Sequence, residues 1–157
     1  MNFSFRPWYH DLIFWEIFLL DWVSKWIAVD NFYRPLKITS FLSLKVSINR
    51  GISWSLFSGN DTLTFVIISS LVFGILCFLA YYTLERQKEE YDVLGETLLL
   101  AGGFSNFIDR LIYGGVIDFI SISWGGWSFP IFNIADIVIS IGVMVIIYRF
   151  LFGEPEE

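Results

Sequence analysis

Four apolar segments, each about long enough to cross a lipid bilayer, constrain the fold of this chain more than any other feature. The hydrocarbon core of a bilayer requires about 20 apolar residues per helix. The segments cover residues 12–29, 62–84, 93–113 and 134–152, and the second of them contains no charged residue. We therefore predict an α-helical integral membrane protein with four transmembrane helices, built as one domain over residues 1–157.

The composition supports a membrane protein and excludes several other classes. Hydrophobic residues make up 55% of the 157 residues and charged residues 17%, against about 25% charged residues in soluble domains. Much of the net charge of −6 lies in the stretch ERQKEEYD and in the final EPEE, and no basic patch suggests nucleic acid as a partner. Cys77 is the only cysteine, so an intramolecular disulfide and a cysteine-based metal motif are excluded.

Two stretches between the helices have the pattern of strands. In the insert 30–61, the pieces 36–49 and 51–57 are strand-like, and the first alternates partly in polarity. Farther along, the pieces 120–124 and 127–131 flank Gly125-Gly126, which is a two-residue hairpin signal. The predicted register pairs Trp124 with Trp127, Ser123 with Ser128, Ile122 with Phe129, Ile120 with Ile131 and Asp118 with Asn133. Pro130 weakens such a ladder. With four helices in the membrane, we expect these pieces to form a small β platform at one face.

Asp118 and Asp136 are the only charged residues between Gly114 and Ser140, and we call them the acidic pair. The hairpin would bring them close together, because Asp136 begins a helix three residues after Asn133. Two adjacent carboxyl groups in apolar surroundings cannot both ionise cheaply, so one keeps a proton and the other remains a base. That arrangement can activate water for peptide hydrolysis without a metal. On spacing alone, a proton- or ion-coupled transporter ranks ahead of a protease, and a non-enzymatic membrane scaffold is a further alternative.

Other polar residues lie inside the apolar segments, where they are costly and suggest function or pairing. Asp21 and Lys25 are spaced to pair on one helix face, although Lys25 could instead extend to the membrane surface. In the third segment one face carries Gly102, Asn106, Asp109, Arg110 and Tyr113. Gly102 and Gly103 would allow a neighbouring helix to approach closely. For Glu16, the sequence suggests only an interhelical hydrogen bond.

Five motifs, in this order along the chain, resemble the family of lipoprotein signal peptidases, the bacterial type II signal peptidases. The motifs are DWVSK (21–25), NRGISW (49–54), GGFSNFIDR (102–110), GGVIDF (114–119) and FNIAD (132–136). The resemblance implies that Asp118 and Asp136 are the catalytic aspartates of a membrane protease that uses no metal and no cofactor. It also implies substrate binding by Asn49, Gly51, Asn106, Arg110 and Asn133, and structural roles for Asp21, Lys25 and Asp109.

The resemblance further implies a substrate and a location. Family members remove the signal peptide from prolipoproteins that carry a diacylglyceryl-cysteine, and they cut just before that cysteine. We expect prolipoproteins and membrane lipids as partners, no nucleic acid, and a monomer in the bacterial inner membrane. Both termini would be cytoplasmic, with the active site near the periplasmic face, although the Lys and Arg residues of the loops do not decide the direction. The chain departs from the usual family residues at Trp22, Ser53, Trp54, Ser105 and Ile137, which puts its substrate preference in doubt.

Overall fold

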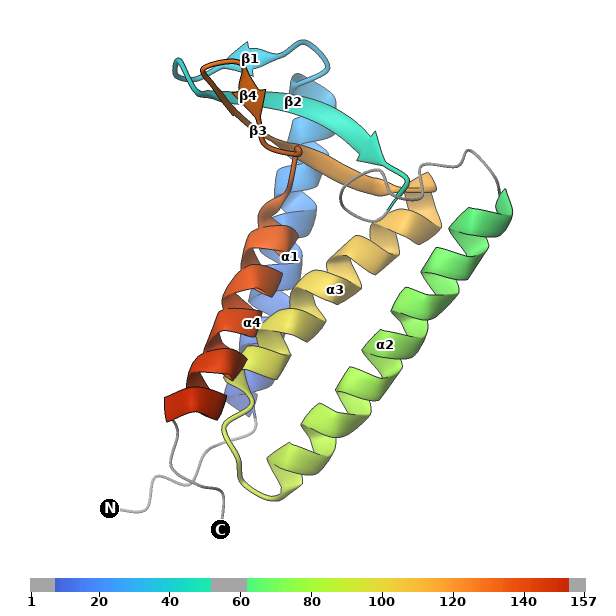
Figure 1. The fold of residues 1–157 in the computed structure, drawn as a ribbon. Coiled ribbons are helices and arrows are strands. Elements are labelled where there is room, and N and C mark those ends of the chain that lie inside the picture. Colours follow the sequence, from blue (N-terminus) through green and yellow to red (C-terminus); the bar gives the residue numbers. More distant parts are fainter. Residues whose placement is uncertain (1–7, 52–61, 153–157) are drawn as a thin grey trace.

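The computed structural model describes residues 8–51 and 62–152, which form four helices and one small sheet (Figure 1). The helices are α1 (Trp8–Asn31), α2 (Thr62–Lys88), α3 (Leu94–Tyr113) and α4 (Ile134–Phe152), and the strands are β1 (Leu36–Lys37), β2 (Leu42–Asn49), β3 (Val116–Trp124) and β4 (Trp127–Ser128). Each apolar segment of the sequence lies almost entirely within one of these helices. The prediction of a mainly helical chain with a small β platform is therefore confirmed.

Helix α3 lies at the centre of the helices, with α1 and α4 packed on one side and α2 on the other (Figure 1). The sheet covers one end of the helices, and α1 begins and α4 ends at the opposite end. A Cβ atom on Gly102 would lie 2.7 Å from the carbonyl oxygen of Ala135 in α4, and one on Gly103 would lie 2.8 Å from Cδ2 of Leu76 in α2. The close approach expected at these two glycines is confirmed on both sides of α3.

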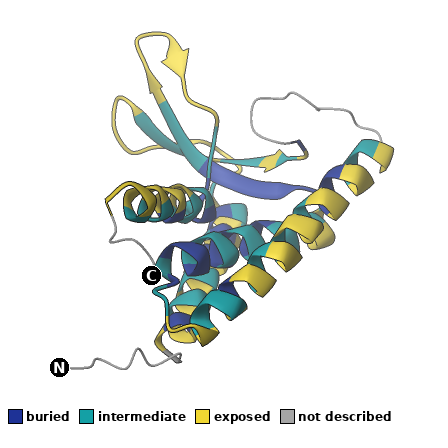
Figure 2. Cartoon of the chain, turned by 60° about the horizontal axis from the view of Figure 1, so that its bottom comes forward, coloured by how far each residue is buried: buried dark blue, intermediate teal, exposed yellow. Residues whose placement is uncertain are grey.

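The helices differ in how well they are suited to a bilayer. Of the described helices, α2 and α4 are long and apolar enough to cross a membrane by length and composition alone. Helices α1 and α3 carry more charge, but Asp21, Lys25 and Asp109 are at most 1% exposed and lie inside the molecule. Exposed residues lie on the outer faces of the helices (Figure 2), and many of these residues are large and apolar. Glu16 is exposed on α1, and its side chain forms no hydrogen bond or ion pair with another described residue, so the expected interhelical bond is not formed there.

The sheet is antiparallel with the order β1-β2-β3-β4, and its last two strands form the predicted hairpin. Gly125 and Gly126 have φ angles of 58° and 85°, as a type I′ turn requires. The pairs Trp124–Trp127 and Ser123–Ser128 are confirmed, and the Phe129 amide donates to the Ile122 carbonyl at 2.8 Å. The next predicted pair is wrong, because Ile120 pairs with Phe132 and not with Ile131. The register shifts by one residue at Pro130, which has no N–H group for the ladder.

A second irregularity lies in β2 and determines which residues share a face with Asp118. Between Leu44 and Ser47 the register with β3 shifts, so that Ser47 is opposite Asp118 and Asn49 is opposite Val116. An unbroken register would have placed Asn49 on the other face of the sheet, because a slip by one residue reverses the faces. The bulge therefore brings Asn49 beside Asp118. The second predicted strand piece of the insert, residues 51–57, falls outside the described residues after Gly51.

Candidate active site

Asp118 and Asp136 line one cavity of about 1100 Å³ between the sheet and helices α3 and α4. Asp118 comes from β3, and Asp136 comes from the first turn of α4. Four of the five residues expected to bind substrate line the same cavity, namely Asn49, Gly51, Asn106 and Arg110. The fifth, Asn133, is 0% exposed and lies behind the acidic pair. The fold thus brings together residues from four separate motifs.

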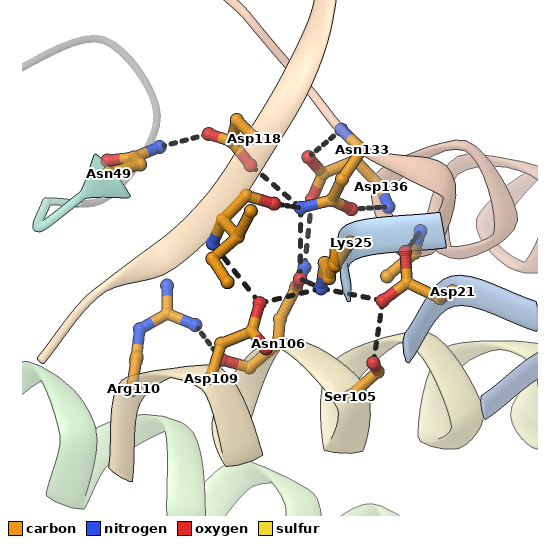
Figure 3. Close-up of polar contacts among 12 residues, drawn as sticks. Asp21, Lys25, Asn49, Ser105, Asn106, Asp109, Arg110, Asp118, Asn133 and Asp136 are labelled. Carbon is orange, nitrogen blue, oxygen red and sulfur yellow. Dashed lines mark hydrogen bonds and ion pairs between the residues drawn. The ribbon is translucent and has the colours of Figure 1, made fainter. Parts of the chain in front are cut away.

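Asn133 connects the two carboxyl groups of the acidic pair (Figure 3). Its side-chain Nδ2 donates to Oδ1 of Asp118 at 2.7 Å. Its Oδ1 accepts a bond of 2.9 Å from the backbone N–H of Asp136, and its own backbone N–H donates to Oδ2 of Asp136 at 3.2 Å. The reciprocal bonds to Asp136 form a capping box at the start of α4. One residue therefore begins the helix and holds both carboxyl groups.

Asp118 lies in an environment that favours its protonated form. It is 2% exposed, and its second oxygen, Oδ2, accepts a bond of 3.1 Å from Nδ2 of Asn49. Asn49 is itself held by the Gly51 amide, which donates to its Oδ1 at 3.1 Å. Burial, together with the neighbouring charge of Asp136, raises the pKa of Asp118 from 3.8 to about 7. Asp118 can therefore hold a proton close to neutral pH.

Lys25 forms a buried charge cluster with two aspartates below the cavity. Its Nζ lies 2.6 Å from Oδ2 of Asp21 and 2.8 Å from Oδ2 of Asp109, and Lys25 is 1% exposed. The predicted pair with Asp21 is confirmed, and the alternative that Lys25 extends to the membrane surface is wrong. Asp21 also accepts bonds from Ser105 Oγ at 2.6 Å and from the Ala135 amide at 2.8 Å. The cluster thus joins α1, α3 and the start of α4.

Asn106 links this charge cluster to the acidic pair. Its Oδ1 accepts bonds from Nζ of Lys25 at 2.9 Å and from Nδ2 of Asn133 at 3.1 Å. Its Nδ2 donates to Oδ1 of Asp136 at 2.9 Å. One turn later in α3, the guanidinium group of Arg110 donates to the Asn106 carbonyl at 3.0 Å and lines the cavity. The polar face predicted on α3 therefore points at the acidic pair.

The arrangement is suited to general acid–base chemistry. Asp118 and Asp136 are held by amide groups at the wall of the cavity, and one of them can keep a proton while the other accepts one. A water molecule between them could be activated for attack on a carbonyl group. Across residues 8–51 and 62–152, no group of three or more His, Cys, Asp or Glu side chains is placed to hold a metal ion.

Two parts of the supporting network were not found from the sequence. Ser105 was noticed only as a departure from the usual family residue, although its spacing of four from Asp109 puts both on one side of α3. Ile117 takes part through its backbone: its N–H donates to Asp109 at 3.1 Å, and its carbonyl accepts from Asn133 at 3.3 Å. The spacing of Ser105 from Asp109 could have indicated its role. The contacts of Ile117 are made by its backbone, and no residue type in the sequence indicates them.

Comparison with known families gives a match over most of the chain. The family model for signal peptidase (SPase) II, Peptidase A8, matches residues 13–152. The chain belongs to the signal peptidase II family. The match includes both aspartates of the acidic pair and the eight other positions assigned from the resemblance.

Relatives and solved structures agree with signal peptidase II. The lipoprotein signal peptidase of Wigglesworthia glossinidia brevipalpis is 36% identical over 141 residues, which cover 88% of this chain and 92% of the relative. That of Listeria monocytogenes serotype 4a is 34% identical over 149 residues, covering 91% and 94%. A solved bacterial membrane enzyme superposes with a TM-score of 0.76 at 30% identity, covering 100% of this chain and 98% of that one. A second has a TM-score of 0.73 at 32% identity, covering 98% and 99%.

Membership in signal peptidase II confirms the family suggested by the five sequence motifs. It makes this chain a peptidase, and the solved neighbours confirm the membrane class predicted from composition. The five residues that differ from the usual residues of signal peptidase II lie in different parts of the chain. Ser105 supports Asp21, Trp22 and Ile137 are exposed, and Ser53 and Trp54 lie outside the described residues.

Proposed function

We propose that the chain is an intramembrane aspartic endopeptidase that removes the signal peptide from diacylglyceryl-modified prolipoproteins, cutting just before the lipidated cysteine. The observation that carries the proposal is the acidic pair itself. In a signal peptidase II chain, Asp118 and Asp136 are held by one buried residue, Asn133, at the wall of a large cavity. Two carboxyl groups that share a proton are sufficient for metal-free peptide hydrolysis.

The proposed reaction uses one carboxylate and one carboxylic acid of the pair. The carboxylate takes a proton from water as the water oxygen attacks the scissile carbonyl carbon, and the carboxylic acid gives its proton to the carbonyl oxygen. The gem-diol then collapses. The proton held by the first aspartate goes to the leaving nitrogen, the second aspartate takes back a proton from a hydroxyl group, and the C–N bond breaks. Both aspartates return to their starting states.

The fold suggests how a lipid-modified substrate could be accommodated. Asp136 lies in the first turn of α4, and the cavity continues along α4 past Ile137, Ile141 and Met144. An apolar signal segment and the diacylglyceryl chains can remain in hydrocarbon while the scissile bond meets the acidic pair at the end of the helices. We propose that all four helices of this single domain, residues 1–157, cross the bacterial inner membrane. Both termini would then be cytoplasmic and the sheet periplasmic. Because one chain supplies both aspartates, a monomer is sufficient.

Five residues around the pair would position substrate and catalytic groups. Asn49 and Asn133 hold Asp118, Asn106 holds Asp136, and Gly51 and Arg110 line the cavity. Asp21, Lys25 and Asp109 would support these residues from below. In this proposal no metal and no cofactor takes part.

The test is cleavage of a diacylglyceryl-modified prolipoprotein by the purified protein in detergent or liposomes. We expect release of the signal peptide with and without EDTA, and no release from the same prolipoprotein before lipidation. Asp118→Asn and Asp136→Asn, made separately, should insert normally and abolish cleavage, since neither aspartate can be both acid and base. A tenth of the wild-type activity in either variant would argue against the acidic pair, and activity lost in EDTA and restored by a divalent ion would argue against metal-free chemistry.

A further inference from the structure

The ammonium group of Lys25 reaches the acidic pair through a single side chain, that of Asn106 (Figure 3). A lysine has three N–H donors, and in this site they face Asp21 at 2.6 Å, Asp109 at 2.8 Å and Oδ1 of Asn106 at 2.9 Å. Two of these partners are carboxylates that compensate the charge. The third is an amide that also contacts Asp136.

The cation determines which way the Asn106 amide is oriented. An ammonium group donates hydrogen bonds and cannot accept them, so the amide oxygen must face Lys25. The amide nitrogen then faces the other way, where it donates to Oδ1 of Asp136 at 2.9 Å. Asn133 Nδ2 donates to the same amide oxygen at 3.1 Å and favours the same orientation. Reversing the amide would lose all three bonds. Lys25 therefore keeps the Asn106 N–H group directed at the Asp136 carboxylate.

Asp136 is better placed than Asp118 to carry the negative charge of the pair. It lies in the first turn of α4, where the helix dipole favours an anion. Its donor from Asn106 is strengthened because the same amide is bonded to a cation. Asp136 is also partly exposed, whereas Asp118 is 2% exposed. Burial and the charge of Asp136 raise the pKa of Asp118 to about 7, which favours a proton on Asp118.

We propose that Lys25 is a positioning residue that acts through Asn106 to keep Asp136 ionised, so that Asp136 is the base and Asp118 the acid of the reaction. The inference rests on the proposed function and adds the assignment of the two roles. Asp136 takes the proton from the attacking water, and Asp118 gives its proton to the scissile carbonyl oxygen. The proton on Asp136 then passes to the leaving nitrogen, and Asp118 recovers a proton from the gem-diol as the C–N bond breaks.

The charged groups around Asp136 allow a test that separates Lys25 from its counter-charges. They are Lys25 and Asp21 on α1, Asp109 and Arg110 on α3, and Asp118 on β3. Removing Lys25 alone would leave two buried carboxylates without a cation, which destabilises the fold for reasons unrelated to catalysis. The double variant Lys25→Met/Asp109→Asn reduces this cost, because it removes one charge of each sign and leaves Asp21 as the single carboxylate without a cation. The single variant Asp109→Asn keeps Lys25 and removes one of its counter-charges, and the asparagine oxygen can still accept the Ile117 N–H.

The readout is the pH profile of kcat for prolipoprotein cleavage between pH 5 and 8, with KM and the thermal unfolding midpoint measured alongside. The acid limb of this profile reports ionisation of the base. We expect the limb to move up in Lys25→Met/Asp109→Asn, because the net charge of the cluster is unchanged while the Asn106 donor to Asp136 is no longer held in place by Lys25. In Asp109→Asn we expect it to move down. KM should change little in either variant.

Opposite shifts cannot arise if Lys25 only stabilises the fold, because lost stability lowers the rate without moving the limb. An unmoved limb in both variants, or movement in the same direction, would overturn the proposal. If the double variant does not accumulate in the membrane, Lys25→Met/Asp21→Asn replaces it: an upward shift supports the proposal, and any other result overturns it. Failure of the proposed function looks different, since the wild-type protein would then release no signal peptide or both Asp→Asn variants would remain active.

Discussion

Asn133 and Asp136 hold each other across the first turn of α4, with a bond of 2.9 Å from the Asp136 amide to the Asn133 side chain and one of 3.2 Å from the Asn133 amide to the Asp136 carboxylate. A capping pair of this kind usually serves only to begin a helix. In this chain the spare N–H of the capping side chain donates to Asp118 at 2.7 Å. The start of α4 and the geometry of the acidic pair are therefore one structure.

The first prediction is that Asn133→Ala impairs cleavage far more than stability. Loss of the cap should cost about 1 kcal/mol of unfolding free energy. Loss of the bond from Nδ2 to Asp118, about 0.5–1.5 kcal/mol, together with the misplacement of a catalytic carboxyl group, should lower kcat roughly ten- to a hundredfold. Asp92→Ala is the matched control, because Asp92 bonds to the Leu94 amide at 3.0 Å at the start of α3, at the end away from the sheet. The two variants should have similar unfolding midpoints in detergent, and only Asn133→Ala should cleave slowly; equal rates would contradict the role of Asn133.

The second prediction concerns pH and stability. The pKa of Asp118 is raised from 3.8 to about 7 by burial and by the charge of Asp136. Between these two values the folded protein keeps a proton that the unfolded chain has released, so stability falls as pH rises, by about 1.4 kcal/mol per pH unit. Below about pH 4 the contribution of Asp118 to folding stability is fully present. Above about pH 7 stability falls no further through this group.

Asp118→Asn removes this titration and provides the comparison. The unfolding midpoint of the variant, relative to that of the wild type, should rise between pH 5 and 7 and then remain level. Thermal unfolding in detergent micelles at several pH values measures the difference. A difference that stays constant from pH 5 to 8 would mean that Asp118 ionises in the folded protein as easily as in the unfolded chain.

Local features of the sequence predicted the helices and the turn well. The charge-free run 62–84 lies within α2, and Gly125-Gly126 forms the expected turn. Each of these depends on residues close together in the chain. The pairing of Asp21 with Lys25 was predictable for the same reason, since four residues separate them on one helix face.

Features that depend on distant segments could not be predicted in this way. The register shift at Pro130 and the bulge between Leu44 and Ser47 are set by how the strands fit together and meet the helices. Pro130 indicated where the ladder would weaken but not that the register would shift. Local alternation gave no sign of the bulge, which decides whether Asn49 faces Asp118. The contact between Lys25 and Asn106 also joins residues 81 positions apart. The motifs therefore identified the residues of the site but not the bonds between them.

The third prediction separates Arg110 from the other arginines. Its guanidinium group lines the cavity and donates to the Asn106 carbonyl at 3.0 Å. Removing a charged donor of this kind costs about 1.5–3 kcal/mol, so Arg110→Ala should lower kcat/KM roughly ten- to a hundredfold. Arg34→Ala, which removes an exposed arginine from the insert, should leave it unchanged. Equal effects in the two variants, measured by prolipoprotein cleavage, would mean that Arg110 acts only through overall charge.

The last prediction tests whether the hairpin turn sets the geometry of the acidic pair. Gly125 and Gly126 have positive φ angles, which β-branched residues strongly disfavour. Gly125→Val/Gly126→Val should therefore distort the hairpin that leads from Asp118 back to α4, while the helices still insert, because their packing does not involve the turn. Cleavage should fall about a hundredfold, as expected for a misplacement of about 1 Å in catalytic groups.

The matched control is Gly74→Val in α2, where an added Cβ would have no atom within 4 Å, so membrane insertion and cleavage should both persist. Membrane insertion followed by a cleavage assay with the lipidated prolipoprotein measures both variants. If the turn variant inserts and cleaves at the wild-type rate, the turn does not organise the pair. The bonds of Asn133 to Asp118 and of Asn106 to Asp136 would then be sufficient to fix the two carboxyl groups, since both are made by residues outside the turn.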